Sequence, residues 1–169
     1  MTAFANDSKT SGPVTAIWKL LEEVPDPEVP VLSVLDLGVV RNVILHTDPE
    51  GDWVEVVITP TYTGCPAMDM IAMQIKMTLA EHGFARTKIT LVLAPAWTTD
   101  WMSDAGKEKL QAYGIAAPYA NRNGEEPLVI CPQCHSTHTT LISQFGSTAC
   151  KALYRCEDCR EPFDYFKCH

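Results

Sequence analysis

Basic residues are scarce in this sequence, and long apolar runs are missing altogether. Thirteen Lys and Arg residues stand against 21 Asp and Glu residues, which gives a formal net charge of −8. Proteins that grip phosphate backbones need clustered basic side chains, so this balance excludes nucleic-acid binding as the main role. No apolar run approaches the roughly 18 residues that a membrane-spanning helix requires. We therefore expect protein or small-molecule partners, no nucleic acid and no membrane.

Signatures of several enzyme classes and of export are also absent. No Glu-x-x-His pair occurs on an expected helix, which argues against a di-iron site of that type. No glycine-rich loop suited to flavin or nicotinamide phosphates is found. The first residues, MTAFANDSKTSGP, lack a basic start followed by an apolar stretch. We therefore expect a cytoplasmic protein whose cysteines are reduced thiols or metal ligands.

Cysteine is concentrated towards the C-terminal end. Two pairs, Cys131-Pro-Gln-Cys134 and Cys156-Glu-Asp-Cys159, are separated by residues 135–155. A two-residue spacing lets both thiolates of a pair reach one ion, and two such pairs complete a tetrahedral site. The sequence therefore predicts a closed, structural zinc site with Cys131, Cys134, Cys156 and Cys159 as ligands. An iron–sulfur cluster in place of zinc stays open.

Four further side chains near these pairs are additional candidates for metal ligands. They are Cys150, Cys168, His135 and His138. One interpretation makes Cys150 a small buried apolar residue and the histidines exposed. The other has one of the spare thiols replace a ligand of the four-cysteine site. The sequence does not decide between them.

The periodicity of apolar residues predicts an α/β (α+β) protein in two parts. Residues 1–12 are expected to form a disordered lead-in, and residues 13–115 a small domain with a mixed sheet and two main helices. Residues 116–127 are the expected linker, and residues 128–169 a small all-β zinc ribbon. So short a ribbon buries too little apolar surface to fold alone, so metal binding must supply folding free energy.

Within the first part, helices are expected near residues 14–24 and 66–82. A hairpin is expected over residues 33–59, a third strand at 88–93, and a short helix capped by Ser103. Trp97, Trp101 and Met102 lie in a loop-like stretch. They fit either a partner interface or packing inside the chain.

Cys65 is the candidate functional thiol. It follows an expected strand and precedes Pro66, which opens the second long helix. The positive end of a helix dipole favours thiolate, the nucleophilic and metal-binding form. Asp26 and Glu28 in the proline-rich loop can assist transient iron binding, or they can simply solvate that loop. For Cys65 itself, a capping or half-buried structural role stays open.

Three spaced motifs in residues 13–95 carry a family resemblance. Asp26-Pro-Glu-Val-Pro-Val31, then Asp36-Leu-Gly38, then Thr-Gly-Cys65-Pro66 resemble the iron–sulfur-assembly domain family that includes SufT. The resemblance implies a small α/β fold and a functional role for Cys65, with Asp26 and Glu28 as weaker candidates. Tyr62 departs from the family pattern, because it interrupts the run of hydroxyl residues that often precedes the cysteine.

The closing stretch, from PQCHSTH to FKCH, resembles the PaaD family of aerobic phenylacetate degradation. The resemblance implies a non-enzymatic accessory or maturation factor of the multicomponent phenylacetyl-CoA epoxidase (ring-1,2-epoxidase). Its oxygenase and reductase components would be the partners. The cofactors would be structural zinc and transient iron or an iron–sulfur cluster. A non-catalytic structural subunit and a thiol enzyme using Cys65 are the alternatives, and a homodimer stays open.

Overall fold

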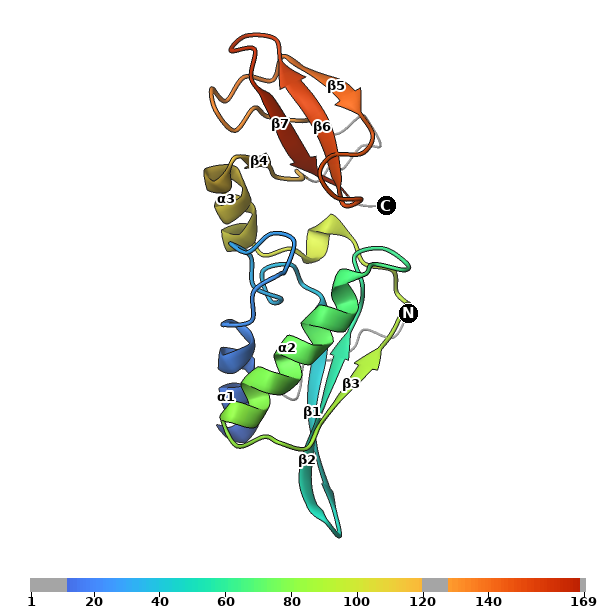
Figure 1. Ribbon diagram of the computed structural model, residues 1–169. Helices are drawn as coiled ribbons and strands as arrows, with labels where there is room; N and C mark the ends of the chain where they lie inside the picture. Colours follow the sequence, from blue (N-terminus) through green and yellow to red (C-terminus); the bar gives the residue numbers. More distant parts are fainter. Residues whose placement is uncertain (1–11, 120–127, 168–169) are drawn as a thin grey trace.

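The protein consists of two parts stacked end to end, as Figure 1 shows. This computed structural model describes residues 12–119 and 128–167. A mixed α/β part is followed by a small β part, which confirms the predicted fold class. Gly12 is the one residue of the expected lead-in that lies inside the described ranges. Much of the expected linker and Cys168 lie outside them, and the domain boundaries stay a prediction.

A three-stranded mixed sheet forms the centre of the first part. Strand β1 (Val40–Asp48) pairs antiparallel with β2 (Gly51–Ile58), and β2 pairs parallel with β3 (Thr87–Leu91). The predicted hairpin is present, but its first strand begins at Val40, so residues 33–39 of the predicted range belong to the loop before it. The predicted third strand is present but begins one residue earlier and ends two residues earlier than residues 88–93. Successive side chains of β2 point to opposite faces of the sheet, and one of these faces buries Val54, Val56 and Ile58.

Two helices complete the core of the first part. Helix α1 (Gly12–Leu21) begins next to Pro13, whose fixed φ suits a first helical turn. Helix α2 (Ala67–Glu81) connects β2 to the parallel strand β3 and crosses the sheet (Figure 1). Apolar residues at helical spacing on both helices are buried in one cluster with the sheet. Those of α2 are Ala67, Met68, Ile71, Ile75 and Leu79.

The loop between α1 and β1, which contains the proline-rich residues 25–30, is tied to a helix much later in the chain by Asp36. Its Oδ2 accepts hydrogen bonds from the backbone N–H and hydroxyl of Ser33, both at 3.0 Å. Its Oδ1 accepts one from Ser103, the N-cap of helix α3 (Asp104–Tyr113), and Lys109 Nζ lies 2.6 Å from Oδ2. Burial opposes ionisation, but these donors together lower the pKa of Asp36 below its ordinary value.

Gly38 lies where this loop meets the short 3₁₀ helix η2 (Thr99–Trp101). Its φ is +69°, and a Cβ at this position would lie 2.1 Å from the backbone oxygen of Trp101. Only glycine fits so close an approach of two backbones in the left-handed region.

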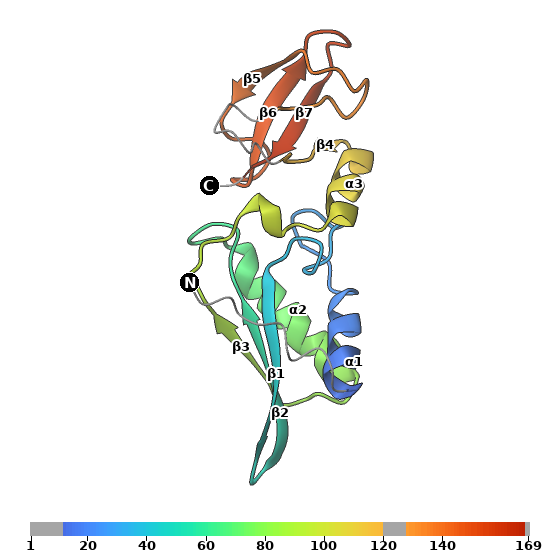
Figure 2. The same cartoon turned by 180° about the vertical axis from the view of Figure 1, so that it is seen from behind.

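The second part is a four-stranded sheet in the order β4-β7-β6-β5. Its strands are β4 (Ile115–Ala116), β5 (Thr139–Ser143), β6 (Lys151–Cys156) and β7 (Pro162–Phe166). The antiparallel pair β5–β6 confirms the predicted ribbon hairpin. Strand β4 directly follows α3 and pairs parallel with β7, so the chain joins this sheet as it leaves the first part (Figure 2).

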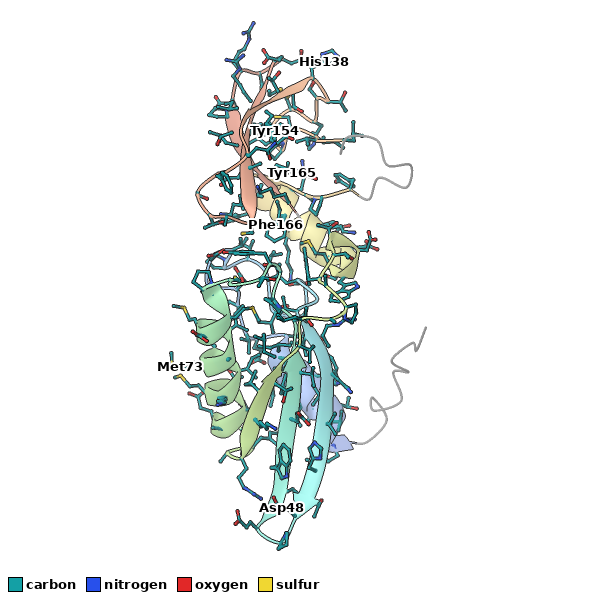
Figure 3. The ribbon with its side chains drawn as sticks, turned by 90° about the vertical axis from the view of Figure 1, so that its right-hand side faces the viewer. Asp48, Met73, His138, Tyr154, Tyr165 and Phe166 are labelled. Atoms are coloured by element: carbon teal, nitrogen blue, oxygen red, sulfur yellow. The ribbon has the colours of Figure 1, made fainter. Side chains whose placement is uncertain are left out.

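Side chains from the second part also enter the core of the first. Phe166 is 2% exposed and meets Trp97 edge-on, with ring centroids 6.2 Å apart. Figure 3 places Phe166 at the base of the ribbon, beside the first part. Cys150 belongs to the same buried cluster. Other buried ribbon residues, among them Val129, Ala152 and Phe163, form a separate small core. Within the described ranges, no helix combines the length and the apolar character needed to cross a bilayer.

Candidate metal centre and the Cys65 cavity

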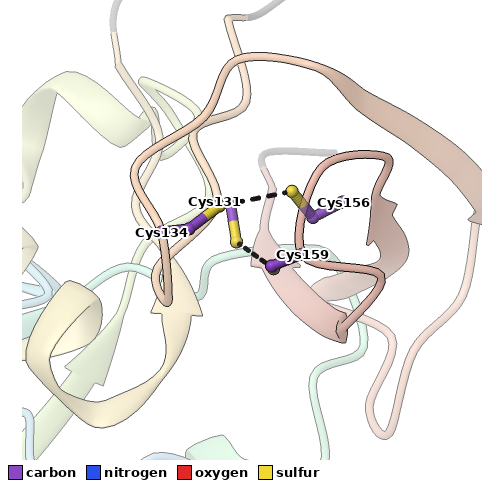
Figure 4. A group of neighbouring side chains, drawn as sticks. All are labelled: Cys131, Cys134, Cys156 and Cys159. Atoms are coloured by element: carbon purple, nitrogen blue, oxygen red, sulfur yellow. Dashed lines mark hydrogen bonds between the residues drawn. The ribbon is translucent and has the colours of Figure 1, made fainter.

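The four predicted ligands converge at one end of the ribbon. The Sγ atoms of Cys131, Cys134, Cys156 and Cys159 all lie within 4.8 Å of one another, and the side chains point inward (Figure 4). Cys131 and Cys159 are 3.7 Å apart, and Cys134 and Cys156 are 3.5 Å apart. A tetrahedral zinc with Zn–S bonds of about 2.3 Å requires sulfur separations of about 3.8 Å. The distances therefore fit a four-thiolate metal ion.

Both cysteine pairs have the same tight backbone turn. The residue after each pair, His135 or Arg160, has a positive φ, 61° and 68° respectively. The N–H of His135 donates to Cys131 O at 3.0 Å, and that of Arg160 donates to Cys156 O at 3.1 Å. Each turn folds the second cysteine back towards the first, so both sulfurs face the same point.

The electrostatics of Cys156 and Cys159 favour a bound cation. The backbone N–H of Cys159 stabilises the Cys156 thiolate and, against the effect of burial, lowers its pKa to about 7. For Cys159, the N–H of Glu161 favours the thiolate, but burial and the neighbouring thiols raise the pKa to about 12. One thiolate thus forms readily, and its charge opposes ionisation of the next. A divalent cation at the centre removes that opposition.

Among the described residues, none of the additional candidates belongs to this group of four cysteines. The Nδ1 of exposed His138 lies 3.4 Å from Asp158 Oδ1, and His135 occupies the turn just described. Cys150 is buried at the junction with the first part. Cys168 lies outside the described residues. The structure thus brings together the four cysteines that the spacing predicts.

Cys65 lies in a turn immediately before α2. Its N–H donates to Tyr62 O at 3.2 Å, and Gly64 within the turn has a φ of +82°. Pro66 is the N-cap of α2, so Cys65 stands just outside the positive end of the helix. The side chain is half-buried. Burial and the nearby Cys65 raise the pKa of Tyr62 to about 12.

Asp26 and Glu28 lie beside Cys65. All three line one cavity of about 10 Å³. Asp26 Oδ1 accepts the backbone N–H groups of Glu28, at 2.9 Å, and Val29, at 2.6 Å, so it fixes the loop that presents Glu28. Burial raises the pKa of Asp26. Their role as metal ligands stays a prediction.

Cys150 is a lining residue of this cavity that sequence reasoning did not place there. Its Sγ lies 3.3 Å from Glu28 Oε2 and 3.0 Å from Thr148 Oγ1. Burial raises its pKa to about 12. Phe166 lines the same cavity. No local pattern signals the contact, because residues 28 and 150 are far apart in the chain.

The tryptophan-containing stretch packs inside the molecule. Trp97 is 3% exposed, and its indole N–H donates to Leu37 O at 2.8 Å. Met102 is buried as well. The guanidinium of Arg41 lies 3.4 Å from the ring centroid of half-buried Trp101. Of the two interpretations of this stretch, the structure therefore supports internal packing.

Comparison with known proteins agrees with this two-part structure. Residues 15–90 match the family described as iron-sulfur cluster assembly protein, and residues 116–167 match the PaaD zinc beta ribbon domain. A protein of Escherichia coli strain K12, provisionally named as a subunit of 1,2-phenylacetyl-CoA epoxidase, is 53% identical over 157 residues, covering 92% of this chain and 93% of that protein. The chain belongs to the PaaD family.

Other relatives of this PaaD-family chain match only its first part. An Fe-S protein maturation auxiliary factor of Porphyromonas gingivalis is 38% identical over 89 residues, which cover 52% of this chain and 81% of that protein. A crystal structure of a domain of unknown function, DUF59, from Bacillus anthracis superposes with a TM-score of 0.50 at 26% identity. It covers 57% of this chain and 90% of that one. The first part of the PaaD-family chain therefore shares the fold of that domain.

Proposed function

We propose that this protein is an accessory factor that helps iron or an iron–sulfur centre reach the multicomponent phenylacetyl-CoA epoxidase. It is not the enzyme itself. Cys65 serves as a transient metal or cluster ligand, and the oxygenase and reductase components are its partners. Four closely spaced reduced thiols suit a reducing compartment such as the cytoplasm.

One observation carries this proposal: a single chain combines a part similar to iron–sulfur assembly proteins with the PaaD ribbon. The relative from Escherichia coli is named for the epoxidase, and the relatives of the first part are named as maturation factors. The cavity lined by Cys65, Asp26 and Glu28 gives that part a thiol and two carboxylates in one place. Thiol and carboxylate groups are ligand types that iron accepts.

Zinc is the proposed resident metal of the ribbon, held by Cys131, Cys134, Cys156 and Cys159. The four thiolates would fill all four coordination positions of a tetrahedral ion, and the bound ion would stabilise the fold. Elemental analysis of protein purified without added metal should give one zinc per chain. Iron with acid-labile sulfide in its place would overturn the assignment.

The accessory role is tested by producing the epoxidase components with this protein, without it, and with Cys65→Ser. Serine is close in size, so the variant should fold with its zinc retained. We expect the components made without the protein, or with Cys65→Ser, to contain less iron or sulfide and to be less active. Components with full metal content in the absence of this protein would contradict the proposal.

A structural subunit is the second candidate, because the relative from Escherichia coli is named as a subunit. Co-purification with the oxygenase in fixed stoichiometry would favour it. A thiol enzyme has less support. A nucleophilic cysteine usually has a positioned base. His46 instead contacts Glu55 and stacks on Trp53, and neither it nor His82 is among the described residues that line the Cys65 cavity.

A further inference from the structure

A second, larger cavity lies beside the loop that carries Cys65. Its volume is about 380 Å³. It is lined by Pro60–Thr63 from this loop and, from the segment after β3, by Leu93, Ala96 and Trp97. Thr61 also lines the smaller Cys65 cavity, so the loop forms a wall that the two cavities share. A group that occupies the larger cavity therefore contacts the loop of Cys65 directly.

Both segments that line this larger cavity are free of charged residues. Residues 56–68 and residues 89–99 contain no Asp, Glu, Lys, Arg or His, although charged residues make up 20% of the chain. The cavity offers its occupant the hydroxyls of Thr61 and Thr63 and an apolar surface, but no countercharge. Taking a charged group out of water without a partner is costly, so the cavity selects an uncharged occupant.

The apolar face of the sheet continues into the solvent at the end of β3. Leu91 pairs with Ile58, which is buried in the core, so both side chains point to the same face of the sheet. Leu91 is nevertheless 53% exposed, and Leu93, two residues further on, is 55% exposed. Figure 1 shows the end of β3 and the loop before α2 at the same end of the first part. An exposed apolar surface therefore adjoins the larger cavity.

The extent of this surface favours a protein as the occupant. A small molecule would need only the cavity, whereas exposed apolar side chains around a cavity are typical of protein–protein interfaces. The centres of such interfaces are poor in charge, and an apolar or aromatic side chain of one protein often fills a pocket of the other. A partner with a charged contact surface would lose hydration here without gaining ion pairs. The surface therefore fits an uncharged, apolar segment of a partner protein.

We propose that the larger cavity, together with Leu91 and Leu93, is the docking site for the protein that exchanges metal with Cys65. The partner inserts one apolar or aromatic side chain between the Cys65 loop and Leu93. The proposal rests on the function proposed above, and it specifies the surface that the oxygenase or reductase component contacts. Docking there places the partner against the loop from which Cys65 presents its thiol.

Binding of the purified oxygenase and reductase components to the full-length, zinc-loaded protein tests the site. We expect at least one component to bind in biolayer interferometry. Leu93→Glu places an unpaired carboxylate at the cavity, and Thr63→Trp fills the cavity with an indole ring. Each change should weaken binding by about tenfold or more, because side chains at the centre of an interface carry most of its affinity.

Matched variants separate docking from folding. Leu128→Glu makes the same change at a ribbon position that is 54% exposed and does not line the cavity, so it should bind like the unchanged protein. Leu93→Met keeps an apolar side chain of similar volume and should bind normally as well. Since Leu93, Thr63 and Leu128 are all exposed, zinc content and melting curves should be the same in all four variants.

Salt gives an independent readout. A docking surface without charges should bind almost equally well at about 50 mM and about 500 mM salt, because screening acts on charged groups. The site does not exist as proposed if neither component binds, if affinity falls steeply with salt, or if Leu93→Glu and Thr63→Trp bind like Leu128→Glu. A dimer of the unchanged protein that Leu93→Glu dissociates would also overturn the proposal, since a second copy would then cover this surface.

These outcomes stand apart from those of the maturation assay. If epoxidase components need this protein for their metal, but Leu93→Glu binds and loads them as well as the unchanged protein does, the function holds and the docking site fails. If Leu93→Glu loses binding, but components made without the protein are fully loaded, the docking site is real and its assigned role is wrong.

Discussion

Asp36 shows how much of this structure depends on one buried carboxylate. In the sequence it belongs to the Asp36-Leu-Gly38 motif, and its side-chain partners there are not evident. In the structure it accepts hydrogen bonds from Ser33 and Ser103 and pairs with Lys109, which joins the proline-rich loop to α3. The same loop presents Asp26 and Glu28 to the Cys65 cavity. The order of the site therefore depends on a residue outside it.

Asp36→Asn should destabilise the protein by about 2 kcal/mol at neutral pH, since hydrogen bonds to a charged group are lost. The pKa of Asp36 is lowered by folding, so its stabilisation is fully present above the ordinary aspartate value of about 3.9 and is lost as the pH falls through the lower folded value. Thermal unfolding of both proteins from pH 7 downwards should show the difference shrinking only in that acidic range. A difference that is constant with pH would contradict a charged Asp36.

Gly38→Ala tests the close approach of the loop to η2. A positive φ and a Cβ 2.1 Å from the Trp101 oxygen together should cost about 3 kcal/mol. The melting temperature should then fall by about 6–12 °C. Gly12→Ala is the control, because a Cβ there meets nothing within 4 Å. Equal melting temperatures for the two variants would show that the loop moves freely away from Trp101.

At the scale of elements, β7 links the two parts of the molecule. Its strand pairs with β6 and β4, while its last residue, Phe166, leaves the ribbon core and packs on Trp97. Phe166 also lines the Cys65 cavity. The strand therefore couples the folding of the ribbon to closure of that cavity.

Phe166→Ala should open this junction. Removing a buried aromatic ring costs about 3 kcal/mol and leaves a void beside Cys150. We expect Cys150 to be alkylated faster by iodoacetamide, measured by peptide mass spectrometry, while the ribbon retains its zinc. Phe145→Ala removes the same ring from a position that is 65% exposed and should leave the rate unchanged. An unchanged rate in Phe166→Ala would mean that other contacts hold the junction closed.

Local patterns in the sequence predicted the elements and the four-cysteine metal centre. The apolar spacing of α2, the alternation in β2 and the two cysteine pairs are short-range features, and each is present in the structure. The two-residue strand β4 was not foreseen, because a strand so short has no periodicity. The contact of Cys150 with Glu28 was also missed, since residues far apart in the chain meet only through tertiary packing.

For the whole molecule, the bound metal should stabilise more than the ribbon. Stripping it with a strong chelator should unfold β5, β6 and β7, because binding free energies of structural zinc are of the order of 10 kcal/mol and the ribbon core is small. Hydrogen exchange should show lost protection in these strands and, to a lesser degree, at residues packed on Phe166. Added zinc should restore both. Full protection in the metal-free protein would refute a metal-dependent ribbon.

The position of Cys150 and Phe166 in the chain has a consequence during synthesis. Every other residue that lines the Cys65 cavity leaves the ribosome before them, and N-terminal parts generally fold first. A nascent chain can thus form the first part with its thiol still accessible. The cavity closes only after the ribbon has been translated and has bound its metal ion. The supply of the ribbon's metal ion would then set when this cavity closes in newly made protein.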